Sequence, residues 1–93
     1  MIVDFKCWAT GVFFKTGKTK EGWQGVAKIA RRKLDQLAAA AVLGDLAAPP
    51  GNRLEALLGT RAGQHSIRIN EQWRVYFIWT DAGPADVEIT DYH

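Results

Sequence analysis

The chain has 93 residues, a length that suits one domain and leaves no room for a second hydrophobic core. Hydrophobic residues make up 47% of the sequence and aromatic residues 11%, a composition that excludes an intrinsically disordered protein. The formal net charge of +2 is too small to indicate a nucleic-acid-binding protein by itself. The charge is uneven, since residues 1–33 contain eight Lys and Arg against two acids, whereas residues 34–93 contain four Arg against eight acids. The basic segment predicts either a surface for an anionic partner or an ordinary solvated lysine face.

Cysteine and histidine are scarce, which limits the possible sites. A lone Cys7 excludes an internal disulfide framework and indicates a reducing, cytoplasmic location. One Cys and two His cannot form a closed Cys/His zinc site, and we expect neither a metal nor another cofactor. The longest apolar run, at residues 37–43, is too short to span a membrane, and the N-terminal sequence predicts no export signal.

The apolar residues of the N-terminal half predict one short strand and two helices. Residues 2–6 alternate in part and favour a strand, and residues 8–14 favour a brief helix. Residues 15–25 contain three Gly and three Lys with few apolar side chains, a composition typical of a loop. From about Trp23 to Ala41 the apolar residues recur at helical spacing, which predicts a longer second helix.

In the C-terminal half the apolar period changes to two, which is typical of strands. The predicted strands cover residues 53–58, 65–70, 73–80 and 86–92. Helices followed by a run of strands predict an α+β fold: an N-terminal strand, two helices, then an antiparallel β-meander with the helices packed on one face. Trp73 and its alternate neighbours should face the helices, which would leave the face of Arg74 open to solvent.

Two arginines on the predicted sheet are candidates for binding RNA. Arg68 alternates with Ser66 and Asn70 on one strand, and Arg74 alternates with Tyr76 on the next. If these strands pair through the short turn between them, both arginines project from the same face. A guanidinium binds phosphate through two hydrogen bonds, and an aromatic ring stacks on unpaired bases. A structural cross-strand role is an equal alternative for either arginine.

Side chains suited to proton transfer lie at the end of the sequence. Histidine changes charge nearest neutral pH, and at His93 the neighbouring carboxylate of Asp91 can orient the ring. Tyr92 offers a hydroxyl group and a stacking ring. A frayed terminal segment is the alternative. His65, on a strand that alternates with apolar residues, is more typical of a structural histidine than of an RNA-binding one.

Several segments of the C-terminal half carry a family resemblance. They are GNRLE at residues 51–55, RAGQHSIRIN at 61–70, QWRVYF at 72–77 and DYH at 91–93. On these segments residues 49–93 closely resemble the HigB-type toxins of bacterial toxin–antitoxin modules, which belong to the RelE/ParE superfamily. The N-terminal half agrees more loosely. The resemblance implies a single RelE/ParE-like toxin domain over residues 1–93, with the fold order derived above.

The same resemblance implies an activity, which is metal-independent cleavage of messenger RNA held on a translating ribosome. In this reaction the RNA 2′-hydroxyl attacks its adjacent phosphate and the 5′-oxygen leaves. The residues that match the catalytic set of the family are Arg74, Asp91, Tyr92 and His93. Our further candidates for RNA binding are Arg61, Arg68 and His65.

The sequence departs from the resemblance at two positions. Some HigB toxins carry a His and a Lys where this chain has Glu55 and Leu58. The change implies either a weaker nuclease or that His65 and Arg61 supply the missing groups.

The resemblance also implies partners. They are a helix-turn-helix antitoxin of the HigA type, the 70S ribosome and messenger RNA, whereas operator DNA is expected to be bound only through the antitoxin complex. Two alternatives stay open. One is a non-enzymatic poison of DNA gyrase with the same fold, which would not need the terminal DYH. The other is an attenuated, RNA-binding relative of the toxins.

Overall fold

The computed structural model describes residues 1–91, and all their side chains except that of Pro50. The helices are α1 (Trp8–Thr16) and α2 (Ala27–Ala39), and short 3₁₀ turns cover Gln24–Val26, Leu43–Leu46, Pro50–Asn52 and Gly59–Arg61. The strands are β1 (Glu55–Ala56), β2 (His65–Arg68), β3 (Trp73–Thr80) and β4 (Gly83–Asp91). They form one antiparallel sheet in the order β1-β2-β3-β4. The predicted α+β fold with a β-meander is confirmed.

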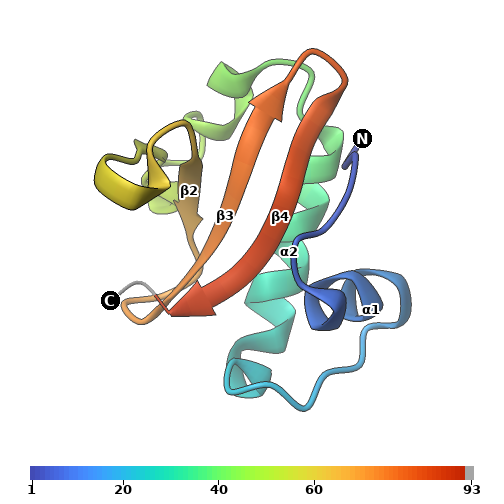
Figure 1. Cartoon of the computed structure of the whole chain (residues 1–93). Helices are drawn as coiled ribbons and strands as arrows, with labels where there is room; N and C mark the ends of the chain where they lie inside the picture. The colour runs from blue at the N-terminus through green and yellow to red at the C-terminus, as the bar shows by residue number, and fades with distance from the viewer. Residues whose placement is uncertain (92–93) are drawn as a thin grey trace.

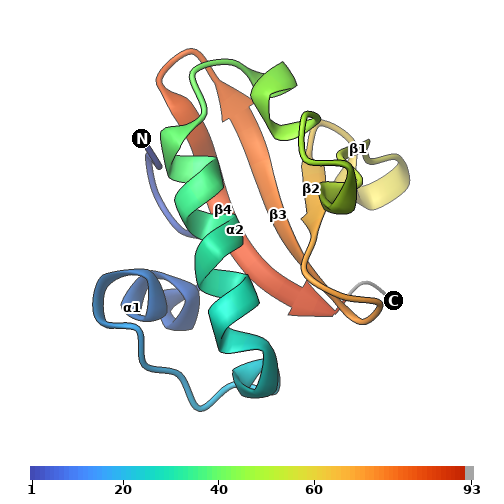
Figure 2. The same ribbon diagram turned by 180° about the vertical axis from the view of Figure 1, so that it is seen from behind.

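Helix α2 covers one face of the sheet, and the core lies between them (Figures 1 and 2). Ala30, Leu34 and Leu37 recur on one side of α2 and are fully buried. They pack in one cluster with Val75 and Phe77 of β3, which are also fully buried. The predicted helix-facing side of this strand is therefore confirmed. Each buried Leu stabilises the fold by about 1.5–3 kcal/mol through the apolar surface removed from water.

The segment predicted as the first strand, residues 2–6, forms only a single parallel bridge, between Phe5 and Val87 of β4. The Val3 and Lys6 amides still donate to β4 carbonyls, and the Asp4 carbonyl accepts from the Val87 amide. Helix α1 begins three residues after the bridge and turns the chain away from the sheet. The segment therefore lines the outer edge of β4 without becoming a full strand (Figure 1).

Element bounds differ from the predictions where local backbone geometry decides them. Helix α1 extends to Thr16 because Gly17 adopts φ 76° and donates its amide to the Phe13 carbonyl, a left-handed helix cap. Helix α2 starts at Ala27, after a 3₁₀ turn that takes up residues 24–26. Strand β4 starts at Gly83, earlier than predicted, because residues 81–82 alone make the turn. Within the described residues, no helix is long and apolar enough to cross a membrane.

Candidate nucleic-acid interface

The sheet face away from α2 carries the candidate site. Residues paired across antiparallel strands share a face. The register pairs Arg68 with Arg74 and Ser66 with Tyr76, so the predicted common face for the two arginines is confirmed. The register continues this face to Glu55 on β1, which pairs with Ser66.

Arg74 is buried on this face, with only 5% of the residue exposed. Its Nη1 donates to Ser66 Oγ at 2.8 Å and to the Arg53 carbonyl at 3.3 Å, and its Nη2 lies 3.7 Å from Glu55 Oε2. The prediction that Arg74 faces outward into solvent is thus wrong. The segment that leads into β1 passes beside the guanidinium and brings the Arg53 carbonyl and Glu55 against it.

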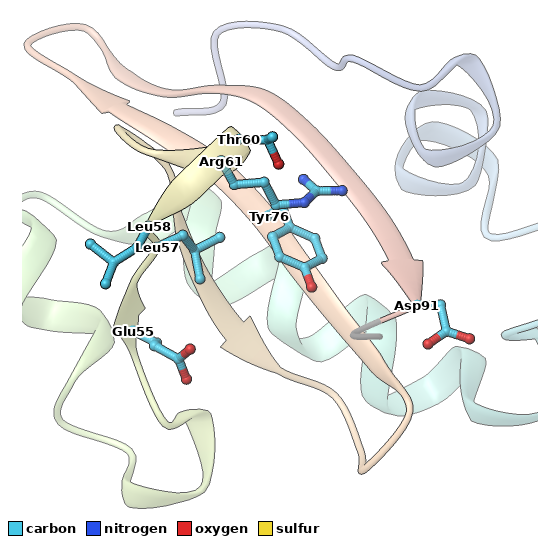
Figure 3. A pocket seen from close by; sticks show the side chains of 7 residues that line it. All are labelled: Glu55, Leu57, Leu58, Thr60, Arg61, Tyr76 and Asp91. Atoms are coloured by element: carbon cyan, nitrogen blue, oxygen red, sulfur yellow. The ribbon is translucent and has the colours of Figure 1, made fainter.

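Arg61 stacks over Tyr76 on the same face (Figure 3). The guanidinium carbon lies 4.0 Å from the ring centroid, which is a cation–π contact, and Tyr76 is buried. Arg61 Nη1 also donates to Glu88 Oε1 at 3.2 Å and to Gln64 Oε1 at 3.0 Å. The Arg61 side chain is still 35% exposed, so it is held on its inner side and accessible on its outer side.

Two depressions lie side by side on this surface and share Glu55. The Tyr76 depression, of about 410 Å³, is lined by Glu55, Leu57, Leu58, Thr60, Arg61, Tyr76 and Asp91. The Arg74 depression, of about 330 Å³, is lined by Arg53, Glu55, Arg68, Asn70, Glu71 and Arg74. Together they contain four arginines and three acids, which makes a mixed surface able to bind an anion next to a carboxylate.

Of the three predicted catalytic residues at the end of the sequence, Asp91 lies within the described residues. Asp91 ends β4, and its Oδ2 accepts a hydrogen bond from Gln72 Nε2 at 3.1 Å. It lies at the far side of the Tyr76 depression from Glu55 (Figure 3). Tyr92 and His93 lie outside the described residues.

His65 is not brought to this site. It pairs with Phe77, and the two rings stack at 6.1 Å, so His65 lies on the face that packs against the helices. Its Nδ1 is buried and has no hydrogen-bond partner within residues 1–91. This placement contradicts an RNA contact from the Arg74 face and agrees with the structural alternative. No group of three or more His, Cys, Asp or Glu that could hold a metal occurs among the described residues.

Two residues that contribute to the site, Arg53 and Ser66, were not predicted from the sequence. Arg53 lines the Arg74 depression and supplies a carbonyl acceptor to Arg74, and Ser66 supplies a hydroxyl acceptor. Arg53 lies within the GNRLE segment, one of the strongest parts of the resemblance. That segment was therefore the available signal, although it did not indicate a backbone role.

Comparison with known proteins decides the family. The family model described as the RelE-like toxin of the type II toxin–antitoxin system HigB matches residues 4–93. The chain belongs to this family.

Toxin HigB-1 of Vibrio cholerae serotype O1 is 52% identical over 50 residues, which cover 54% of this chain and 53% of that protein. An uncharacterized protein of Haemophilus influenzae is 40% identical over 50 residues, which cover 54% of this chain and 50% of that protein. The chain thus spans about half the length of the curated relatives it matches. The resemblance to HigB toxins is confirmed, and with it the assignment to the toxins of type II toxin–antitoxin systems.

Proposed function

We propose that this HigB-family toxin cleaves messenger RNA on the translating ribosome and so inhibits translation and growth. The observation that carries the proposal is the Arg74 guanidinium, held in a defined position on a face with three further arginines. Cations fixed in advance around a phosphate stabilise the charge that develops on its oxygens as the transition state forms. The family model supports the same activity.

The proposed reaction needs a nucleophile, a proton acceptor, a proton donor and positive charge. The RNA 2′-hydroxyl loses its proton to a basic group and attacks the adjacent phosphorus. The bond to the 5′-oxygen breaks, that oxygen receives a proton, and a 2′,3′-cyclic phosphate is left. The Arg74 guanidinium stabilises the negative charge on the phosphate oxygens, a role that a metal ion has in other nucleases. By the resemblance, Asp91, Tyr92 and His93 are the proposed proton-transfer and positioning groups.

Two further arginines are proposed to hold the RNA. Arg61, fixed by Tyr76 and Glu88, presents the outer side of its planar guanidinium, on which an unpaired base can stack. Arg68 is proposed to contact a neighbouring phosphate, which its position in the lining of the Arg74 depression supports. His65 is not part of this proposal, because it lies on the other face of the sheet.

The proposed partners are the 70S ribosome, messenger RNA and a HigA-like helix-turn-helix antitoxin, all in the cytoplasm, with operator DNA bound only through the antitoxin complex. The antitoxin follows from the toxin–antitoxin family of the chain. The ribosome is proposed to present the RNA strand, because Glu55 and Glu71 reduce the positive charge of the Arg74 depression.

The test is in-vitro translation with the cuts mapped by primer extension. Arg74→Ala is expected to lower the cleavage rate about 100-fold or more, in the range seen when one transition-state donor is removed. The cleavage rate of Arg74→Lys should lie between those of Arg74→Ala and the wild type, because lysine keeps the positive charge but lacks the forked geometry of the guanidinium. Arg32→Ala, an equal change of charge on an exposed part of α2, is the control and should cleave at the wild-type rate.

Three outcomes would contradict the proposal. Messages left intact by the wild-type protein, with accumulated gyrase–DNA cleavage complexes, would indicate the gyrase poison. Ribosome binding with no cleavage at any protein level would indicate an attenuated RNA-binding relative. Unfolding of both Arg74→Ala and Arg74→Lys would assign Arg74 a structural cross-strand role instead.

A further inference from the structure

Arg53 holds an unusual backbone conformation next to Arg74. Its φ is +46°, in the left-handed region that non-glycine residues with bulky side chains rarely adopt. Such a conformation persists only where the surrounding structure imposes it, and it is often found at functional sites. The carbonyl of this residue is the one that accepts a hydrogen bond from Arg74 Nη1.

The preceding residue, Asn52, supplies the restraint. Asn52 is fully buried, and its Nδ2 donates to Gln36 Oε1 at 3.0 Å and to the Leu46 carbonyl at 3.1 Å. Its Oδ1 accepts from Lys33 Nζ at 2.5 Å. The three partners come from α2 and from the 3₁₀ turn Leu43–Leu46, so the side-chain amide of Asn52 is fixed to the helical layer by three hydrogen bonds.

These contacts form one path from the helix to the guanidinium. Asn52 is fixed to α2, and Arg53 follows it in a left-handed conformation. The Arg53 carbonyl then accepts a hydrogen bond from Arg74 Nη1, while Glu55, two residues further along, lies beside Nη2. Ser66 Oγ accepts from the same nitrogen. A catalytic group must be held within about 0.5 Å of its productive position. Ser66 and Glu55 contact the guanidinium through side chains that can themselves rotate, whereas the Arg53 carbonyl adds an acceptor fixed to the backbone.

We propose that Asn52 and Arg53 are positioning residues for Arg74, with the buried Asn52 amide setting the Arg53 backbone so that its carbonyl orients the guanidinium. This inference rests on the proposed function for its effect on cleavage. Its structural part, the orientation of Arg74, is independent of which reaction the toxin performs.

A matched pair of variants isolates the backbone effect. Arg53→Asn and Arg53→Val both remove the Arg53 guanidinium, but Asn tolerates positive φ whereas a β-branched residue does not. Both variants lose the Arg53 charge from the interface, so their cleavage rates, with saturating toxin on stalled ribosome complexes, are compared with each other and not with the wild type. Arg53→Val should cleave about 10- to 100-fold more slowly than Arg53→Asn, as for a misplaced catalytic group. The affinity of the two variants for the ribosome should be equal.

A second measurement does not depend on cleavage. The side-chain N–H signals of Arg74, followed by NMR in the free toxin, should stay protected from exchange in Arg53→Asn and lose protection in Arg53→Val. Asn52→Asp, which keeps the acceptor for Lys33 and loses both donated hydrogen bonds, should lose protection as well. Thermal unfolding of each variant confirms that the compared proteins are folded.

The outcomes separate the two claims. Equal Arg74 protection in Arg53→Asn and Arg53→Val would overturn the positioning role, whatever the cleavage rates. Equal cleavage rates with different protection would overturn its link to activity. If wild-type toxin cleaves nothing while the protection pattern is as expected, the proposed function fails and the orienting path from Asn52 to Arg74 stands.

Discussion

At the residue scale, the distinctive feature of this toxin is the carboxylate beside its buried arginine. Glu55 lies 3.7 Å from Arg74 and is 42% exposed at its side chain, so it faces both the guanidinium and solvent. It also lines both depressions of the candidate interface. A phosphate that approaches Arg74 therefore meets a negative charge beside the guanidinium.

Removing that charge should strengthen RNA binding. Glu55→Gln is expected to raise the affinity of the toxin for single-stranded RNA about 2- to 5-fold, since a part-exposed charge contributes up to about 1 kcal/mol. The increase should shrink at high salt, which screens the carboxylate. Fluorescence anisotropy over a salt series measures both effects.

Glu71→Gln is the matched control for Glu55→Gln. Glu71 lines the Arg74 depression, is exposed, and undergoes the same change of charge. An equal gain in RNA affinity in both variants would mean that the affinity depends on the net charge alone and not on the position of Glu55. A drop in cleavage rate on Glu55→Gln, with binding improved, would instead make Glu55 a proton-transfer group in the reaction.

At the scale of the elements, α2 is joined to the segment before β1 by a partly buried ammonium. Burial, with a smaller contribution from repulsion by Arg32, lowers the pKa of Lys33 below its ordinary value of 10.5. The folded state therefore binds this proton less tightly than the unfolded state does. Below the lowered pKa the charged ammonium costs stability, and that cost disappears as the pH rises toward 10.5.

This linkage predicts an alkaline gain in stability. Relative to Lys33→Met, the wild-type free energy of unfolding should increase with pH in the interval just below 10.5, because the neutral amine still donates to Asn52 while its desolvation cost is gone. Urea unfolding at a series of pH values measures the free energy of unfolding of both proteins. In the difference between wild type and Lys33→Met, the contributions of the other titrating groups cancel. A difference that is flat or falls with pH would contradict the assignment.

The elements that were predicted well are those that local periodicity determines. Residues 73–80 form β3 with the predicted bounds, because their alternation alone decides which side chains face α2. The burial of Arg74 was not predictable in this way. It depends on the left-handed backbone at Arg53 and on Asn52, whose hydrogen-bond partners lie 6 to 19 residues away in sequence. His65 was predictable, since it alternates in phase with the buried Ile67.

At the scale of the whole molecule, helix α1 and the candidate interface lie on different sides. Helix α1 lies beyond the β4 edge, whereas β1 and the depressions lie toward the opposite edge (Figures 1 and 2). Trp8 on α1 is 83% exposed between two hollows of about 450 and 610 Å³, both of which it lines together with Val12. Lys15, Lys18 and Lys20 rim these hollows. Glu21 and Asp4 line the same two hollows, so the three lysines leave a small positive excess beside the exposed Trp. This combination fits a helix with apolar and acidic residues.

We expect the HigA-like antitoxin proposed above to use this surface. Trp8→Ser should weaken the complex with that proposed antitoxin about 30-fold or more, since a buried interface Trp is worth about 2 kcal/mol. Cleavage by the free toxin should not change. Isothermal titration calorimetry measures the affinity.

Leu58→Ser is the control for Trp8→Ser. Leu58 is 87% exposed and lines the Tyr76 depression, so it tests the other side of the molecule with a similar loss of exposed apolar surface. If Leu58→Ser weakens antitoxin binding and Trp8→Ser does not, the antitoxin covers the candidate interface instead.

The N-terminal segment that runs along β4 also limits how this sheet can associate. The β4 amides of Asp86, Val87 and Ile89 donate to Asp4 Oδ1, the Asp4 carbonyl and Thr10 Oγ1 of the same chain. At the other edge, β1 is two residues long. A foreign strand would have to displace internal hydrogen bonds at one edge and would find a very short template at the other. The fold is thereby protected against edge-to-edge aggregation, and its partners are expected to recognise side chains instead of extending the sheet.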